Sequence, residues 1–260
     1  MILTNSDNKI LLSDSNKVIQ RIVQPNTFSG LTLWLKAESL SGYTNGSSVT
    51  SWTDSSGNGY NATQGAVAPT CATNFIAGGN GLNYNAVFFN IATGPTLSCV
   101  ASGFTFYNNF TVFVVAYQTS TTANSAVILD KGQSNYNVSG WYVDANVLGL
   151  QKGGGGNGAI AGNIQFDGTG LNYNYLNHWK ALSFIIQSSG AITGWINGVS
   201  GAPVPGIMAT ANSNNLIIGT YGVANTSFGG YLAEIIIYET ALTTNQRQDV
   251  ENYLRLKFKF

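Results

Sequence analysis

From Leu31 onward the chain consists of short apolar runs separated by polar turns. Residues 31–37, LTLWLKA, alternate apolar and polar positions, which is typical of a strand with one buried face. The runs 110–117 and 182–187 are rich in β-branched and aromatic residues and are too short for buried helices. Similar runs occupy 86–91, 125–132, 140–145, 191–198, 214–221 and 233–239. The pattern predicts an all-β fold, an antiparallel jelly-roll β-sandwich.

Two local signals add a hairpin and a single helix to these strands. Asn197–Gly198 lies between apolar runs in the position of a tight hairpin turn. Thr243 and Gln246 have capping-box spacing and open a helical pattern over 243–258. The apolar positions of that helix that fall on one face are Val250, Tyr253, Leu254 and Phe258. We therefore expect one C-terminal helix that packs on the sandwich.

The N-terminal residues differ from the rest of the chain. Residues 2–10 and 11–19 are two similar units in which apolar ends flank a Ser/Asp/Asn turn. Such a short segment cannot bury its apolar residues alone, so it must pair with the main domain, with copies of itself or with a partner. Pro25 and Asn26 end it. We predict an extended arm over 1–27 for anchoring or oligomerisation, and a jelly-roll domain over 28–260.

Composition narrows the range of partners. Only 8% of the 260 residues are charged, with 11 basic and 11 acidic side chains, so nucleic acid or an anionic membrane surface is not an expected partner. No run approaches the length of a membrane-spanning helix. A neutral surface rich in Asn, Gly and Tyr is compatible with neutral ligands such as sugars.

An ordered set of segments resembles the laminin-G-like, concanavalin A-like jelly-roll family. The segments are 31–64, 86–90, 108–120, 178–186, 194–199 and 229–254. The resemblance covers nearly all of 31–257 and implies two packed antiparallel sheets, often a structural calcium, and frequently glycan or protein binding. Members of the family occur in bacterial surface proteins, as accessory modules of enzymes, and in phage tail or capsid decorations.

The loop at 54–59 raises three alternatives. A phosphate-binding loop is excluded because no Lys-Ser or Lys-Thr and no helix follow the glycines. Asp54, Ser56 and Asn58 have the alternating spacing of a calcium loop, but Gly65 occupies the position where an EF-hand needs Glu. Calcium would then require a distant acid, for which Glu234 is the candidate because an acid among core residues needs a partner. The remaining alternative is a tight turn.

Candidate catalytic groups are scarce, and we expect no enzymatic activity. No acids share a strand face in the paired arrangement used for glycoside hydrolysis. His178 is the only histidine, and the chain has no nucleophile-elbow motif.

Glycan binding would use aromatic faces in loops, with Asn or Asp as hydroxyl partners. Candidate residues in loop-like positions are Tyr136, Trp141, Tyr173, Tyr175 and Tyr221. The same tyrosines could instead cover the rim of the sandwich or contact other subunits. Cys99 is expected in the core, and a bridge to Cys71 is left open.

Together these observations favour a non-enzymatic virion-surface protein, such as a phage spike, fibre or decoration, that attaches to a host glycan. The N-terminus lacks the features of a signal peptide, which favours export by another route, such as within a virus particle. The arm would bind other virion proteins or sister subunits in a homo-oligomer. The alternatives are an adhesion module of a bacterial surface protein and a purely structural protein.

Overall fold

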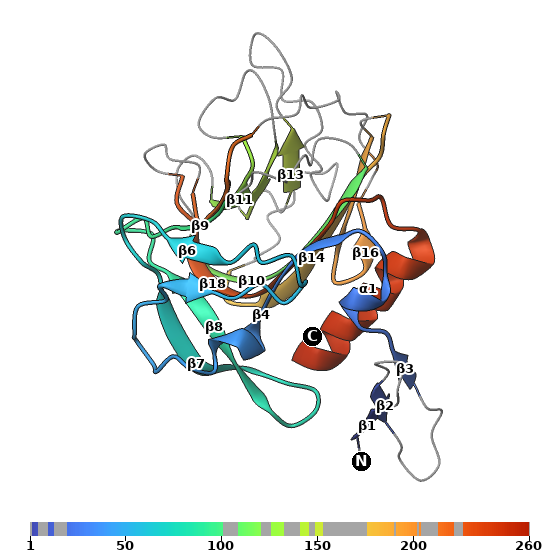
Figure 1. Ribbon diagram of the computed structural model, residues 1–260, viewed down its shortest axis with the longest axis horizontal. Helices are drawn as coiled ribbons and strands as arrows, with labels where there is room; N and C mark the ends of the chain where they lie inside the picture. The colour runs from blue at the N-terminus through green and yellow to red at the C-terminus, as the bar shows by residue number, and fades with distance from the viewer. Residues whose placement is uncertain are drawn as a thin grey trace.

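The computed structural model describes residues 2–4, 10–12, 20–100, 109–120, 126–132, 141–145, 149–152, 176–189, 191–201, 203, 213–220 and 226–259. Two antiparallel sheets in these residues form a β-sandwich, as predicted (Figure 1). No helix among them is long and apolar enough to cross a membrane.

The larger sheet has eight strands within the described residues. In spatial order they are β16 (Val199–Ser200), β15 (Ile192–Ile196), β14 (Trp179–Ile186), β10 (Phe110–Ser120), β18 (Gly229–Tyr238), β8 (Asn83–Phe89) and β7 (Thr70–Ala77), with β4 (Leu31–Lys36) also paired to β18. The strand β18 is central because β10 pairs with one edge, while β8 and β4 share the other.

The second sheet has seven strands in the described part of the chain. They are β13 (Gly149–Lys152), β12 (Trp141–Asp144), β11 (Val127–Asp130), β17 (Leu216–Ile218), β9 (Leu97–Cys99), β6 (Ala62–Gln64) and β5 (Ser51–Trp52). The two sheets enclose the inner core, which contains Trp52, Phe110 and Phe184. Cys71 and Cys99 are buried there as free thiols rather than a bridge.

A second apolar layer, the outer core, lies on the opposite face of the eight-stranded sheet under α1 (Thr244–Phe258) (Figure 1). The predicted capping box is present between Thr243 and Gln246. The four predicted apolar helix positions are all buried. The helix therefore covers the sheet, as the sequence predicts.

The arm ends inside the outer core. Its strands β1 (Ile2–Thr4), β2 (Ile10–Leu12) and β3 (Gln20–Ile22) form a small antiparallel sheet that is separate from the sandwich sheets (Figure 1). Ile22 packs in the outer core, and the buried Tyr238 hydroxyl donates a hydrogen bond to the Pro25 carbonyl at 2.7 Å. A 3₁₀ turn, η1 (Pro25–Thr27), then leads into β4. The end of the arm is thus fixed to the sandwich.

Local turns follow their sequence signals. Asn197 and Gly198 join β15 to β16 with φ angles of 50° and 81°, as the hairpin turn requires. A bulge in β18 was not predicted. Glu234 pairs with Val115 and Leu232 with Ala116, which leaves Ala233 as an extra residue between them.

Tyr238→Phe should reduce the free energy of unfolding by about 1–2 kcal/mol, because the buried Pro25 carbonyl loses its donor. It should also make the chain near Pro25 more sensitive to protease. Urea unfolding and limited proteolysis measure both effects. Tyr231→Phe, at a partly exposed tyrosine of the same strand, is the control; equal effects of the two substitutions would contradict this role.

Candidate functional site

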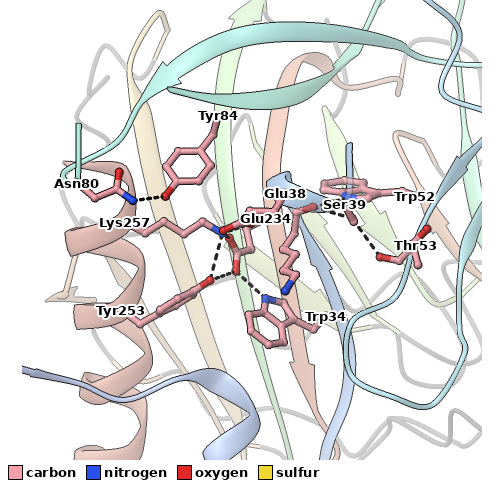
Figure 2. Close-up of polar contacts among 11 residues, drawn as sticks. Trp34, Glu38, Ser39, Trp52, Thr53, Asn80, Tyr84, Glu234, Tyr253 and Lys257 are labelled. Carbon is pink, nitrogen blue, oxygen red and sulfur yellow. Dashed lines mark hydrogen bonds and ion pairs between the residues drawn. The ribbon is translucent and has the colours of Figure 1, made fainter. Parts of the chain in front are cut away.

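An ionic cluster, buried except at Glu38, joins β18, α1, β4 and the 3₁₀ turn η2 (Ala37–Leu40) (Figure 2). The fully buried Glu234 Oε2 lies 2.6 Å from the Lys257 ammonium, which also lies 2.6 Å from Glu38 Oε2. The other Glu234 oxygen accepts hydrogen bonds from the Trp34 indole at 2.6 Å and the Tyr253 hydroxyl at 2.9 Å. Each oxygen of the buried carboxylate therefore faces a donor, which offsets part of the free-energy cost of burying it.

The bulge in β18 makes this cluster possible. Tyr231 contacts Tyr117 and Phe75 on the outer face of the sheet, and Glu234 meets Tyr253 on the same face. Residues three positions apart would lie on opposite faces of a regular strand. The extra residue, Ala233, shifts the alternation and turns Glu234 towards α1.

The pKa values of Glu234 and Lys257 depend both on their burial and on the charges paired with them. Burial raises the pKa of Glu234 above its ordinary value, with Lys257 opposing that rise. Burial also acts against the charged form of Lys257, but the two carboxylates outweigh it and raise the pKa of the ammonium. Lys257 is therefore held as a cation at neutral pH. Its charge is balanced within the protein by Glu234 and Glu38.

A pocket of about 480 Å³ lies over this cluster. It is bounded by the end of the arm, β4, η2 (Ala37–Leu40), the β7–β8 hairpin and the last turns of α1. Aromatic side chains in its wall are Trp34, Tyr84 and Tyr253, and Asn80 donates a hydrogen bond to the Tyr84 hydroxyl at 2.8 Å. Its size falls within the range of small-molecule sites. We call it the α1 pocket.

A smaller pocket of about 250 Å³ lies elsewhere along α1, between Gly198 and Glu251. None of the residues that line it is aromatic. It therefore offers no ring face to a sugar.

An aromatic row crosses the outer face of the eight-stranded sheet. Trp179, Tyr117, Tyr231 and Phe88 come from four adjacent strands, with centroid separations between neighbours of 5.4, 5.9 and 4.7 Å. Phe75 stacks on Tyr231 at 3.8 Å. Phe75 covers the ring of Tyr231, and no residue of the row lines either of the two pockets described above. The α1 pocket is concave, as small-molecule sites usually are, and is therefore the better candidate site.

The structure brings three of the predicted calcium ligands, Asp54, Ser56 and Asn58, together in one hydrogen-bonded turn, but places the fourth, Glu234, in the ionic cluster. The Asp54 carboxylate accepts hydrogen bonds from the amides of Trp34, Ser56 and Tyr60 and from the Ser56 hydroxyl. The Asn58 side-chain amide donates to the carbonyls of β4. The Asp54 oxygens therefore face donors, as in a tight turn, rather than a cation, and Asn58 contacts β4 through its side-chain nitrogen.

Glu234 does not complete a calcium shell in this structure, because Lys257, Trp34 and Tyr253 surround its carboxylate. The described residues contain no group of three or more His, Cys, Asp or Glu that could hold a metal. The proposed ligand set therefore does not fit calcium, and calcium binding elsewhere in the chain stays a prediction.

The prediction that Trp141 lies in a loop and binds a glycan is wrong. Trp141 lies on β12 with its side chain 1% exposed, stacked on Phe110 at 5.0 Å, because it faces the inner core. It is not available to a ligand. Tyr136, Tyr173, Tyr175 and Tyr221 lie outside the described residues, so their role stays a prediction.

Sequence reasoning missed the α1 pocket, although two signals pointed to it. Glu234 lies in an apolar strand and needs a partner. Lys257 follows Tyr253 by four positions, which places a cation on the apolar face of the helix. Together, these two residues form the ion pair that the structure contains.

Comparison with protein families and with curated protein sequences gives no match. Solved structures share the fold. Domain 4 of AbnA, an extracellular GH43 arabinanase from Geobacillus stearothermophilus in complex with arabinotriose, is 20% identical, with a TM-score of 0.51 over 85% of this chain and 98% of that chain. The binding domain of botulinum neurotoxin serotype D is 13% identical, with a TM-score of 0.57 over 86% of this chain and 51% of that one.

A sialidase from Trypanosoma rangeli, in complex with the inhibitor DANA, is 13% identical, with a TM-score of 0.52 over 86% of this chain and 33% of that one. This chain therefore spans about a third of the sialidase and about half of the toxin binding domain. At these low identities the likeness shows a shared β-sandwich fold alone.

Lys257→Met should lower the free energy of unfolding by about 3–5 kcal/mol, because it leaves Glu234 buried without its cation. Adding Glu234→Gln to it should recover about half of that loss or more, since the second charge is then removed too. Urea unfolding of the two single variants, Lys257→Met and Glu234→Gln, and of the double variant measures the coupling. A double variant whose loss equals the sum of the two single losses would refute it.

Asp54→Ala should lower the free energy of unfolding by about 2–3 kcal/mol, because four donors in the 54–60 turn lose their acceptor. The loss should be the same in calcium and in chelator, as measured by thermal unfolding in each. A loss seen only in calcium would instead show that Asp54 acts through a metal.

Proposed function

We propose that this protein is a non-enzymatic carbohydrate-binding module with a laminin-G-like sandwich, and that it attaches to a cell-surface glycan. The observation that carries the proposal is the α1 pocket, whose lining combines the edges of three mostly buried aromatic side chains with hydrogen-bonding side chains. Sugars present both apolar C–H faces and hydroxyl groups, so they are recognised by this mixture of surfaces.

The fold supports the proposal without deciding it. Domain 4 of AbnA is matched over nearly its whole length, and its structure is of a complex with arabinotriose. The neurotoxin structure is a binding domain. The sialidase belongs to an enzyme class, so fold likeness alone does not separate binding from catalysis.

Display on the surface of a virus particle, as in a phage spike, fibre or decoration, is the second part of the proposal. The arm would bind virion proteins or sister subunits in a homo-oligomer. Its end is tied to the sandwich through Ile22 and Pro25, so a load on the arm would reach the domain directly. A module of a bacterial surface protein would share the glycan site and differ in its anchoring.

A glycan array probed with the full chain tests the first part. We expect binding to a restricted set of glycans. Asn80→Ala should weaken it about threefold to tenfold, because Asn80 borders the pocket and positions the Tyr84 hydroxyl. Val100→Ala, an exposed position that does not line the pocket, is the control. A blank array together with no binding to cells would overturn the proposal.

A further inference from the structure

The α1 pocket concentrates positive charge in a chain whose net charge is zero. Its lining contains Lys36, Arg255, Lys257 and Lys259, but only one acid, Glu38. Even when the buried Glu234 behind the wall is included, the four cations exceed the carboxylates by two charges. The carbonyl end of α1 offsets only about half a charge. The pocket is therefore electropositive.

The cations of the pocket divide into two groups. Lys257 is bound by Glu234 and Glu38, and its side chain is 6% exposed, so its role is structural. Lys36 and Lys259 form no ion pair with any described residue, and Arg255 donates only to Asn252, at 3.3 Å. These three side chains are free to meet an anion from solution.

Lys36 has a geometry suited to a charged sugar. Its ammonium lies 4.6 Å from the centroid of the Trp34 ring. Both residues lie on β4, two positions apart, and so project from the same face of the strand. The Trp34 side chain is 4% exposed, so its ring supports the ammonium from below and is itself covered by it. A ligand in the pocket would therefore meet the cation first, and an anionic substituent would be accommodated there.

We infer that the α1 pocket binds sugars that carry a carboxylate, with Lys36 as the principal cation and Arg255 and Lys259 in support. This inference rests on the proposed glycan-binding function and names the class of ligand. Charge complementarity of this kind strengthens binding and makes it sensitive to salt. The partly exposed position of Lys36 limits the effect to that of a screened, hydrated pair.

Three probes share the same sugar ring and differ in charge. Glucose is neutral, glucuronic acid carries a carboxylate, and glucose 6-sulfate carries a sulfate. Titration of the full chain with each should give tighter binding of glucuronic acid than of glucose, by about fivefold to tenfold. Raising the salt concentration should reduce that preference.

Lys36→Gln should abolish the preference for glucuronic acid, whereas Lys36→Arg should retain most of it because the charge remains. Thermal unfolding of both variants checks that each is folded. Equal binding of glucose and glucuronic acid, unaffected by Lys36→Gln, would overturn this inference and leave the proposed function standing. A preference for glucose 6-sulfate would overturn the carboxylate assignment. No binding to any glycan would overturn the proposed function together with this inference.

Discussion

The buried carboxylate of Glu234 is the constraint on which the outer half of the molecule depends. It lies on the central strand of the larger sheet, fully buried under a helix. A carboxylate in that position is tolerated only if donors surround it, because an unpaired buried charge costs several kcal/mol. Those donors come from β4 and α1. The carboxylate, together with the buried apolar face of α1, therefore sets where the helix lies on the sheet and how it is rotated about its axis.

The same arrangement builds the candidate site. Glu234 and Glu38 hold Lys257 between them, so the last turn of α1 is attached to β18 and to η2, which follows β4. The arm and the β7–β8 hairpin close the remaining sides. A pocket assembled from a strand, a helix and a tied arm is preorganised, which reduces the ordering cost of binding. The cations that the cluster leaves unpaired then determine which ligand the pocket favours.

Much of this fold follows from local sequence patterns. Alternation predicted the strands, the capping box predicted α1, and Asn197–Gly198 predicted a hairpin, because each depends on neighbouring residues alone.

The candidate site was harder to predict. The need of Glu234 for a partner is evident from the sequence, but the predicted partner was a calcium ion shared with the 54–58 loop, and the structure has Lys257 instead. The bulge at Ala233, which turns Glu234 towards the helix, leaves no signature in the alternation. Trp141 was misplaced because pattern alone does not tell which face of β12 is buried.

The most direct test of the account is the indole N–H spectrum of the tryptophans during a titration with glucuronic acid. The chain has five tryptophans, and Trp34 is the one among the residues that line the α1 pocket. Its indole donates to Glu234, so it reports on both the pocket and the ionic cluster. We predict a saturable shift of the Trp34 resonance while those of Trp52 and Trp141 in the inner core stay unchanged. A Trp34 resonance that does not move while the sugar binds would show that the site lies elsewhere.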